Sequence, residues 1–183
     1  YIEKKKDAGQ IPMAGYADLM RFALLEHYGG TWIDSTVYLT EPLPDMILNS
    51  DFFAVRNSLL LIDNPVLYPA WFLHAKKGNK TIREIRNVAF AYWLKNEHVI
   101  EYLLPNLIIT LVVKSNPKVE KAIPYMNSDY SEYLVKVLAD DYSEEKWNWI
   151  KKLTGIHKLT YKFSEEKQKE QGTYYRILLG EQA

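Results

Sequence analysis

The sequence predicts a mixed α/β fold, because helix-type and strand-type patterns alternate along the chain. Over residues 16–28, apolar side chains recur at the spacing of an amphipathic helix. Residues 31–39, which follow, are rich in Thr, Trp, Ile, Val and Tyr, which favour strands. The Gly29-Gly30 pair between them can end the helix, because glycine adopts the left-handed conformation that helix C-termini often need. A chain of 183 residues can bury a sizeable core, so we predict a single domain over residues 1–183.

The other elements of the first half are predicted from shorter patterns. Residues 1–8 have the composition of a helix that Gly9 closes, and residues 43–49 predict a short helix or turn. A second long helix is predicted to begin after Asn79, a good N-cap residue, and to run to about Lys95. Short apolar segments between these helices predict three strands, over residues 51–56, 59–62 and 70–75.

In the second half, residues 98–114 predict a helix that Pro105 kinks or divides. Periodicity alone leaves open whether residues 107–113 form a buried strand instead. Two shorter helices are predicted over residues 131–139 and 144–153, the second with Ser143 as its N-cap. Residues 157–163 predict a strand. Residues 164–183 form a polar connector followed by a short apolar tail.

Two polar pairs lie in this apolar context. Asp18 and Arg21 are three residues apart on the predicted helix and share a face, where an intrahelical salt bridge is the ordinary explanation. Asp34 and Thr36 are two residues apart on the predicted strand, so they point to the same side. An aspartate close to Trp32 is costly to bury without partners. We therefore expect the glycine turn to gather both acids and the arginine around one solvent-reachable hollow.

These residues belong to a longer ordered pattern: Ala17-Asp18, Arg21, Gly29-Gly30, Trp32-Ile33 and Asp34-Ser35-Thr36. The pattern resembles that of the capsular polysaccharide synthesis family, relatives of the DXD-containing sugar transferases with the GT-A fold. Similarity continues at Tyr92-Trp93, at Ile123-Pro124 and over residues 157–162, so the resemblance spans residues 1–162. It implies a GT-A-like nucleotide-sugar transferase domain.

The resemblance also implies how the acids and the arginine would act. Asp18 and Arg21 would hold hydroxyl groups of the donor sugar, the carboxylate accepting hydrogen bonds and the guanidinium donating them. Asp34 would contact ribose or sugar hydroxyls and, together with His157, a divalent cation such as Mn²⁺ or Mg²⁺. Thr36, a further donor-binding candidate, stands where many relatives have the second acid, and this replacement weakens a cation site.

Lys158 and Lys162 would contact the donor phosphates. On an alternating strand the two lysines share one face while His157 lies on the other, so only a loop would bring all three together. A surface histidine beside solvated lysines is the ordinary alternative. Among the aromatic residues, Trp32 and Trp71 are candidates for stacking on a sugar or acceptor. His74, next to the apolar residues 71–73, is a candidate for an acceptor pocket.

Composition excludes several classes of protein. The net charge of +0 argues against a nucleic-acid-binding module. The absence of cysteine excludes a disulfide framework and thiolate metal sites, and fits a reducing cytosol. The longest apolar run, residues 107–113, is far shorter than the roughly 20 residues of a membrane-spanning helix. We predict a cytoplasmic protein and leave open a place at the inner face of the membrane.

We therefore predict transfer of a sugar from a nucleotide-sugar donor to a polysaccharide or lipid-linked acceptor, with retention of configuration implied by the relatives and no residue assigned as nucleophile. A glycosidase is disfavoured, because Arg21 would keep Asp18 ionised and thus a poor general acid. The alternative is a non-catalytic glycan- or nucleotide-binding module derived from such a transferase. Thr36 motivates it, as does the lack of a candidate in this sequence for the opening strands of the family, so that we expect the chain to be the C-terminal part of a larger GT-A domain. If the chain instead folds without those strands, one edge or face of its sheet would lack cover, which favours a homo-oligomer.

Overall fold

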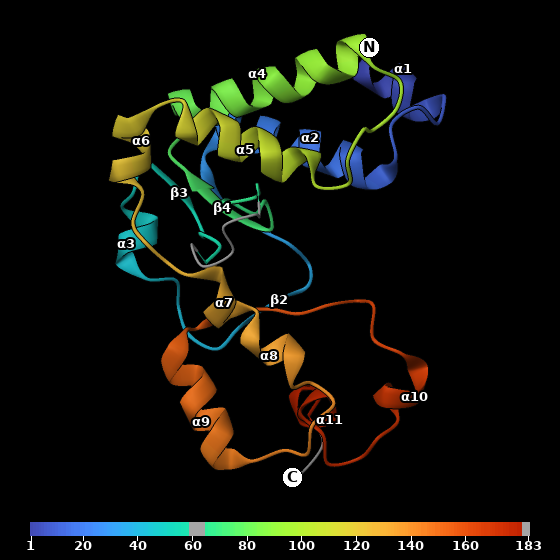
Figure 1. The fold of residues 1–183 in the computed structure, drawn as a ribbon, viewed down its shortest axis with the longest axis vertical. Coiled ribbons are helices and arrows are strands. Elements are labelled where there is room, and N and C mark those ends of the chain that lie inside the picture. The colour runs from blue at the N-terminus through green and yellow to red at the C-terminus, as the bar shows by residue number, and fades with distance from the viewer. Residues whose placement is uncertain (59–64, 181–183) are drawn as a thin grey trace. The chain divides into compact units, whose positions relative to one another are not determined.

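The structure is a computed structural model that describes residues 1–58 and 65–180. It has a mixed α/β fold with small antiparallel sheets, which confirms the predicted α/β class. The chain forms two compact units: Tyr1–Ile33 with Pro44–Met126, and Asp34–Leu43 with Asn127–Ala183 (Figure 1). We describe each unit by itself. That the two units fold together as one domain, as predicted for residues 1–183, stays a prediction.

The first unit contains a three-stranded antiparallel sheet packed against helices. Its strands are β1 (Gly30–Ile33), β3 (Phe52–Ala54) and β4 (Phe72–Ala75), in the order β1-β4-β3. Helices α2 (Met13–Tyr28), α4 (Lys80–Lys95) and α5 (Leu104–Lys114) pack against it (Figure 1). The unit also contains the short helices α1 (Ile2–Asp7), α3 (Asp45–Leu48) and α6 (Pro117–Ala122).

The two faces of this sheet have different surroundings. Leu73 and Ala75 belong to the same buried cluster as the apolar residues of α2, α4 and α5. Strand alternation turns Phe72 and His74 to the opposite face. There, Phe72 contacts Phe53 edge to face, with ring centroids 6.0 Å apart. Both faces are therefore buried at β4, and the strand is apolar at almost every position.

Helix α2 forms for the predicted reason, and its C-terminus is as expected. Leu19, Phe22 and Leu25 form its buried stripe. Gly29 follows the helix with φ of 72°, a conformation that favours glycine. A Cβ atom at Gly29 would lie 2.5 Å from the backbone nitrogen of Lys77, so the position also requires the absence of a side chain. The helix begins at Met13, earlier than the predicted residue 16.

The predicted strand over residues 31–39 is wrong, because the structure divides it. Strand β1 ends at Ile33 and β2 (Val37–Leu39) begins after a turn in which the Val37 N–H donates to the carbonyl oxygen of Asp34, at 2.9 Å. The two strands join different sheets. Apolar and β-branched residues on both sides concealed a turn whose local signal is the Asp34-Ser35 pair.

The start of helix α4 is as predicted from the sequence. The side chain of Asn79 accepts from the N–H groups of Thr81 and Ile82 at 2.8 and 3.1 Å, which confirms the predicted N-cap.

The helix predicted from residue 98 is too long, since α5 begins at Leu104. Pro105 lies in its first turn, where a missing N–H removes no helical hydrogen bond, so it neither kinks nor divides the helix. Residues 107–113 are helical, not a strand.

Three predicted strands of the first half have different outcomes. The segments 51–56 and 70–75 contain the shorter strands β3 and β4. The strand predicted over 59–62 lies outside the described residues.

The second unit is built around a two-stranded antiparallel ribbon of β2 and β5 (Ile156–Lys158). Its core consists of apolar side chains from its helices and from the turn that follows α8: Leu134, Val137, Leu138, Ile150 and Tyr174. Its helices are short: α7 (Ser128–Ser131), α8 (Tyr133–Lys136), α9 (Glu144–Leu153), α10 (Glu165–Gln168) and α11 (Tyr174–Leu178).

Several predictions for this unit need correction. The helix predicted over 131–139 is instead the pair α7 and α8, and the strand predicted over 157–163 ends at Lys158. The predicted helix over 144–153 is confirmed as α9, with the Ser143 hydroxyl accepting from the Lys146 N–H at 3.3 Å. The apolar tail is a helix, and its Tyr174 is fully buried with its hydroxyl donating to the Ser143 carbonyl oxygen at 3.1 Å.

Candidate functional site

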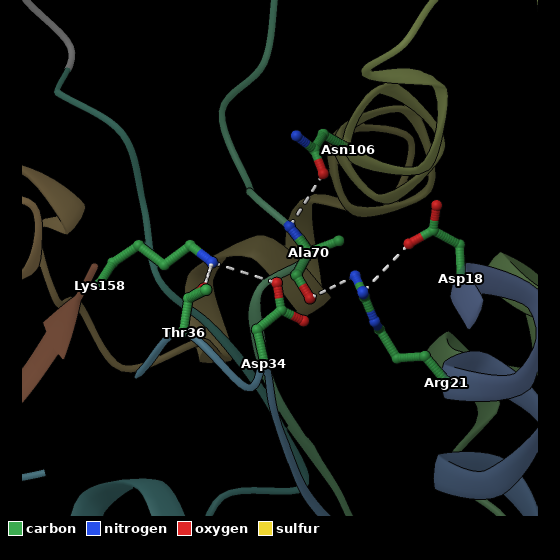
Figure 2. Close-up of polar contacts among 7 residues, drawn as sticks. All are labelled: Asp18, Arg21, Asp34, Thr36, Ala70, Asn106 and Lys158. Atoms are coloured by element: carbon green, nitrogen blue, oxygen red, sulfur yellow. Dashed lines mark hydrogen bonds and ion pairs between the residues drawn. The ribbon is translucent and has the colours of Figure 1, made fainter. Parts of the chain in front are cut away.

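Arg21 is the most strongly anchored of the predicted site residues. It lies on α2 and is only 7% exposed. Its Nη2 lies 3.1 Å from Oδ1 of Asp18, and its Nη1 donates to the carbonyl oxygen of Ala70 at 2.7 Å (Figure 2). The guanidinium carbon also lies 5.1 Å from the centre of the Trp32 ring. The pair is therefore more than an exposed helix salt bridge, because the arginine joins the helix to β1 and to the segment before β4.

Asn106 extends this group, and sequence reasoning missed it. Its Oδ1, on α5, accepts from the N–H of Ala70 at 3.0 Å, while Arg21 donates to the carbonyl oxygen of the same residue (Figure 2). Both backbone groups of Ala70 are thus held by side chains from two helices. An asparagine in the first turn of a largely apolar helix was the available signal.

The second polar group gathers around Lys158 in the second unit. The ammonium nitrogen of Lys158 lies 3.3 Å from Oδ2 of Asp34 and also donates to the hydroxyl of Thr36 (Figure 2). The register of the β2–β5 ribbon explains the contact, because Lys158 is the partner of Val37 and so lies beside the turn that carries both residues. The side chains of Asp34 and Lys158 are 26% and 22% exposed, so the group is partly open to solvent.

The side chains of Asp34 and Thr36 therefore both contact Lys158, but the predicted reason for their proximity is wrong. Both lie in the turn that separates β1 from β2, not on a strand. The chain passes from the first unit to the second between Ile33 and Asp34. The expectation that Asp18, Arg21 and Asp34 share one hollow stays a prediction.

His157, the predicted partner of Asp34 at a cation, is fully buried on β5. Its Nε2 lies 3.1 Å from Oγ1 of Thr40, and its ring lies 5.9 and 6.4 Å from the ring centres of Trp147 and Tyr38. Burial lowers the pKa of the imidazole from 6.5 to about 4, so it is neutral near pH 7. The predicted alternative of a surface histidine is wrong.

These residues do not fit a resident divalent cation held by the protein itself. Across residues 1–58 and 65–180, no cluster of three or more His, Cys, Asp or Glu side chains could hold a metal ion. The carboxylate of Asp34 already faces the ammonium of Lys158. His157 and Lys158 are neighbours on β5, and strand alternation turns them to opposite sides, as predicted. A Mn²⁺ or Mg²⁺ ion that binds together with the donor phosphates, as the resemblance implies, stays a prediction.

The remaining candidates lie in different surroundings. Lys162 is exposed, beyond the end of β5, with its ammonium nitrogen 5.9 Å from the Tyr161 ring. Trp71 is 7% exposed. His74 is buried on β4, where its Nδ1 lies 2.8 Å from Oγ1 of Thr31 and burial, aided by Lys76, lowers its pKa. Phosphate, stacking and acceptor roles for these side chains stay predictions.

The fold and the two polar groups thus define a mixed α/β protein with two clusters of paired acidic and basic side chains. The family model described as "Capsular polysaccharide synthesis protein" matches residues 1–178. The chain therefore belongs to the capsular polysaccharide synthesis protein family, as its sequence pattern predicted, and this membership indicates a role in capsule synthesis. No curated protein matches the chain. Within the described part of the chain, no helix has both the length and the apolar character needed to cross a membrane.

Proposed function

We propose that this chain is a glycosyltransferase of capsule synthesis with a GT-A-like fold, which moves a sugar from a nucleotide-sugar donor to a polysaccharide or lipid-linked acceptor. The observation that carries the proposal is the buried Arg21, which holds Asp18 at 3.1 Å while bonded to the backbone of Ala70. A carboxylate oriented in this way is a preorganised acceptor for sugar hydroxyls. Family membership supports the same reaction class.

In this proposal the two polar groups have different roles. Asp18 and Arg21 bind hydroxyls of the donor sugar, and the group of Asp34, Thr36 and Lys158 binds the ribose and the diphosphate. A positive charge at the diphosphate stabilises the negative charge that develops on the leaving group. We propose retention of the anomeric configuration, as the family resemblance implies, and we assign no nucleophile.

The test is release of nucleoside diphosphate from a panel of nucleotide sugars, with transfer to capsule-type oligosaccharides or lipid-linked acceptors measured in parallel. We expect Asp18→Asn and Arg21→Lys to lose at least tenfold in kcat/KM while the chain stays folded by circular dichroism. Arg83→Lys is the matched control, because Arg83 is an exposed arginine of the same unit that pairs with Glu26. Equal activity in all of these variants would contradict the proposed site.

A non-catalytic glycan- or nucleotide-binding module is the second candidate. The observation that favours it is the turn itself, where Asp34 is already paired with Lys158 and Thr36 supplies only a neutral hydroxyl. Calorimetric titration with the same nucleotide sugars distinguishes the two functions. Saturable binding without hydrolysis or transfer for any donor and acceptor supports the module, whereas slow turnover supports the transferase.

For a lipid-linked acceptor, we propose peripheral association with the inner face of the membrane. Ile100 and Tyr102, between α4 and α5, are 77% and 73% exposed, and aromatic and aliphatic side chains of this kind partition into a lipid interface. Replacing both by serine should reduce co-sedimentation with phospholipid vesicles, whereas Tyr161→Ser in the other unit should not. If light scattering instead shows that the wild type is a dimer and the double variant a monomer, this surface is the interface of a homo-oligomer.

A further inference from the structure

The ammonium group of Lys158 lies where Asp34 and Thr36 would otherwise present their oxygens to a bound cation. It is 3.3 Å from the Asp34 carboxylate and bonded to the Thr36 hydroxyl, and these residues lie 124 and 122 positions away along the chain. The contact does not come from local sequence. It depends on the pairing of β2 with β5, which sets Lys158 opposite Val37.

A positively charged side chain already lies at the oxygens of this group. At nucleotide sites, a divalent cation such as Mg²⁺ is held by one or two carboxylates together with the substrate phosphates. Here the turn supplies one carboxylate and one neutral hydroxyl, and the ammonium of Lys158 lies against both. A second acid at position 36 would leave a net negative charge that favours a cation. Thr36 removes that charge and accepts a hydrogen bond from the ammonium instead.

His157 cannot easily complete a cation site at this point. It is the residue next to Lys158 on β5, so its ring extends to the other side of the strand. There it is fully buried between the Tyr38 and Trp147 rings and bonded to Thr40. A metal ion at Asp34 would also lie close to a fixed positive charge and be repelled by it.

We propose that the ammonium of Lys158 takes the place of the divalent cation in this chain, so that a donor diphosphate binds by direct contact with the lysine. The proposal rests on the proposed glycosyltransferase function for its substrate. In the transfer, the bond between the anomeric carbon and the diphosphate oxygen breaks, and the diphosphate leaves with the electron pair. The acceptor hydroxyl oxygen forms the new bond and its proton passes to the diphosphate. Lys158 stabilises the negative charge on the leaving group and transfers no proton in this step.

The first test needs no substrate. It measures Mn²⁺ binding to the full chain from the loss of the electron paramagnetic resonance signal of the free ion. We expect no saturable binding by the wild type. Lys158→Asp replaces the ammonium by a second carboxylate beside Asp34 and should create a Mn²⁺ site. Lys162→Asp makes the same charge change at an exposed lysine and should not.

Two results would overturn the proposal. One is saturable Mn²⁺ binding by the wild type that Asp34→Asn abolishes. The other is a Lys158→Asp chain, folded by circular dichroism, that binds no more Mn²⁺ than the Lys162→Asp control. Should Lys158→Asp not fold, the wild-type and Asp34→Asn measurements decide alone, and absence of wild-type binding upholds the proposal.

The second test uses UDP and GDP as probes of diphosphate binding, with thermal unfolding as the readout. We expect the nucleotide-induced rise in Tm to be the same in EDTA as in Mn²⁺, to be lost in Lys158→Met and to be retained in part by Lys158→Arg. A rise that requires Mn²⁺ would contradict the proposal. If neither nucleotide binds under any condition, the transferase function fails, while the Mn²⁺ measurement still decides whether the lysine excludes a metal.

Discussion

The guanidinium of Arg21 lies 5.1 Å from the ring of Trp32, so an arginine on α2 packs against the strand that leads to Asp34. The same guanidinium holds the Ala70 carbonyl oxygen at 2.7 Å and Asp18 at 3.1 Å. A buried cation with these partners is both structural and functional in our interpretation. Its replacement should therefore affect stability as well as activity.

Arg21→Ala should lower the free energy of unfolding by about 3–5 kcal/mol, because it leaves the backbone oxygen of Ala70 and the Asp18 carboxylate without their cation. Chemical denaturation followed by tryptophan fluorescence measures the change. The control is Arg83→Ala, which removes a salt bridge to Glu26 from a side chain that is 51% exposed and should cost less than about 1 kcal/mol. Equal losses in the two variants would show that Arg21 is not a buried anchor.

Gly29→Ala should be more destabilising than Gly9→Ala, although both glycines have φ of 72°. Left-handed backbone costs a non-glycine residue about 1–2 kcal/mol at either position. At Gly29 the new Cβ atom would also lie 2.5 Å from the Lys77 nitrogen, whereas at Gly9 it would meet no atom within 4 Å among the described residues. The difference in Tm between the variants measures the clash, and a difference near zero would contradict it.

Asn79→Ala should reduce stability by about 1 kcal/mol, because the N–H groups of Thr81 and Ile82 lose their acceptor at the start of α4. Asn87→Ala is the matched control, since Asn87 is exposed within the same helix and alanine has the higher helix propensity there. Urea unfolding compares the two. A loss as large in the control would remove the capping explanation.

The stability of the chain should fall between pH 6.5 and about pH 4 because of His157. The unfolded imidazole binds a proton below its ordinary pKa of 6.5, whereas burial lowers the folded pKa to about 4. In this window the unfolded state binds more protons, so the free energy of unfolding decreases as the pH falls, by up to about 1.4 kcal/mol per pH unit. Above pH 6.5 the contribution is constant.

His157→Gln removes this titration and should flatten the pH dependence measured by thermal unfolding from pH 7 to pH 4. His74 has a pKa lowered in the same direction, mainly by burial, and retains its own contribution in that variant. A His74→Gln chain is therefore the comparison that separates the two histidines. If the slope is unchanged in His157→Gln, the buried imidazole is not its source.

Much of the local structure could be predicted because its causes lie within a few residues. The stripe of Leu19, Phe22 and Leu25 identifies α2, and Gly29 marks its end. Asn79 marks the start of α4. The ordered pattern from Asp18 to Thr36 likewise identified the family, which depends on residue types and spacing and not on contacts.

The tertiary structure alone decided how the site residues are arranged. Whether residues 107–113 are helix or strand depends on the packing of α5 against its neighbours, because a short run that is apolar at all positions but one has no diagnostic period. Asp34 became a turn residue because the strands on either side of it pair in different sheets. Its partner Lys158 lies 124 residues away, and only the pairing of β2 with β5 brings the charges together, since contacts across such a separation leave no local trace in the amino-acid sequence.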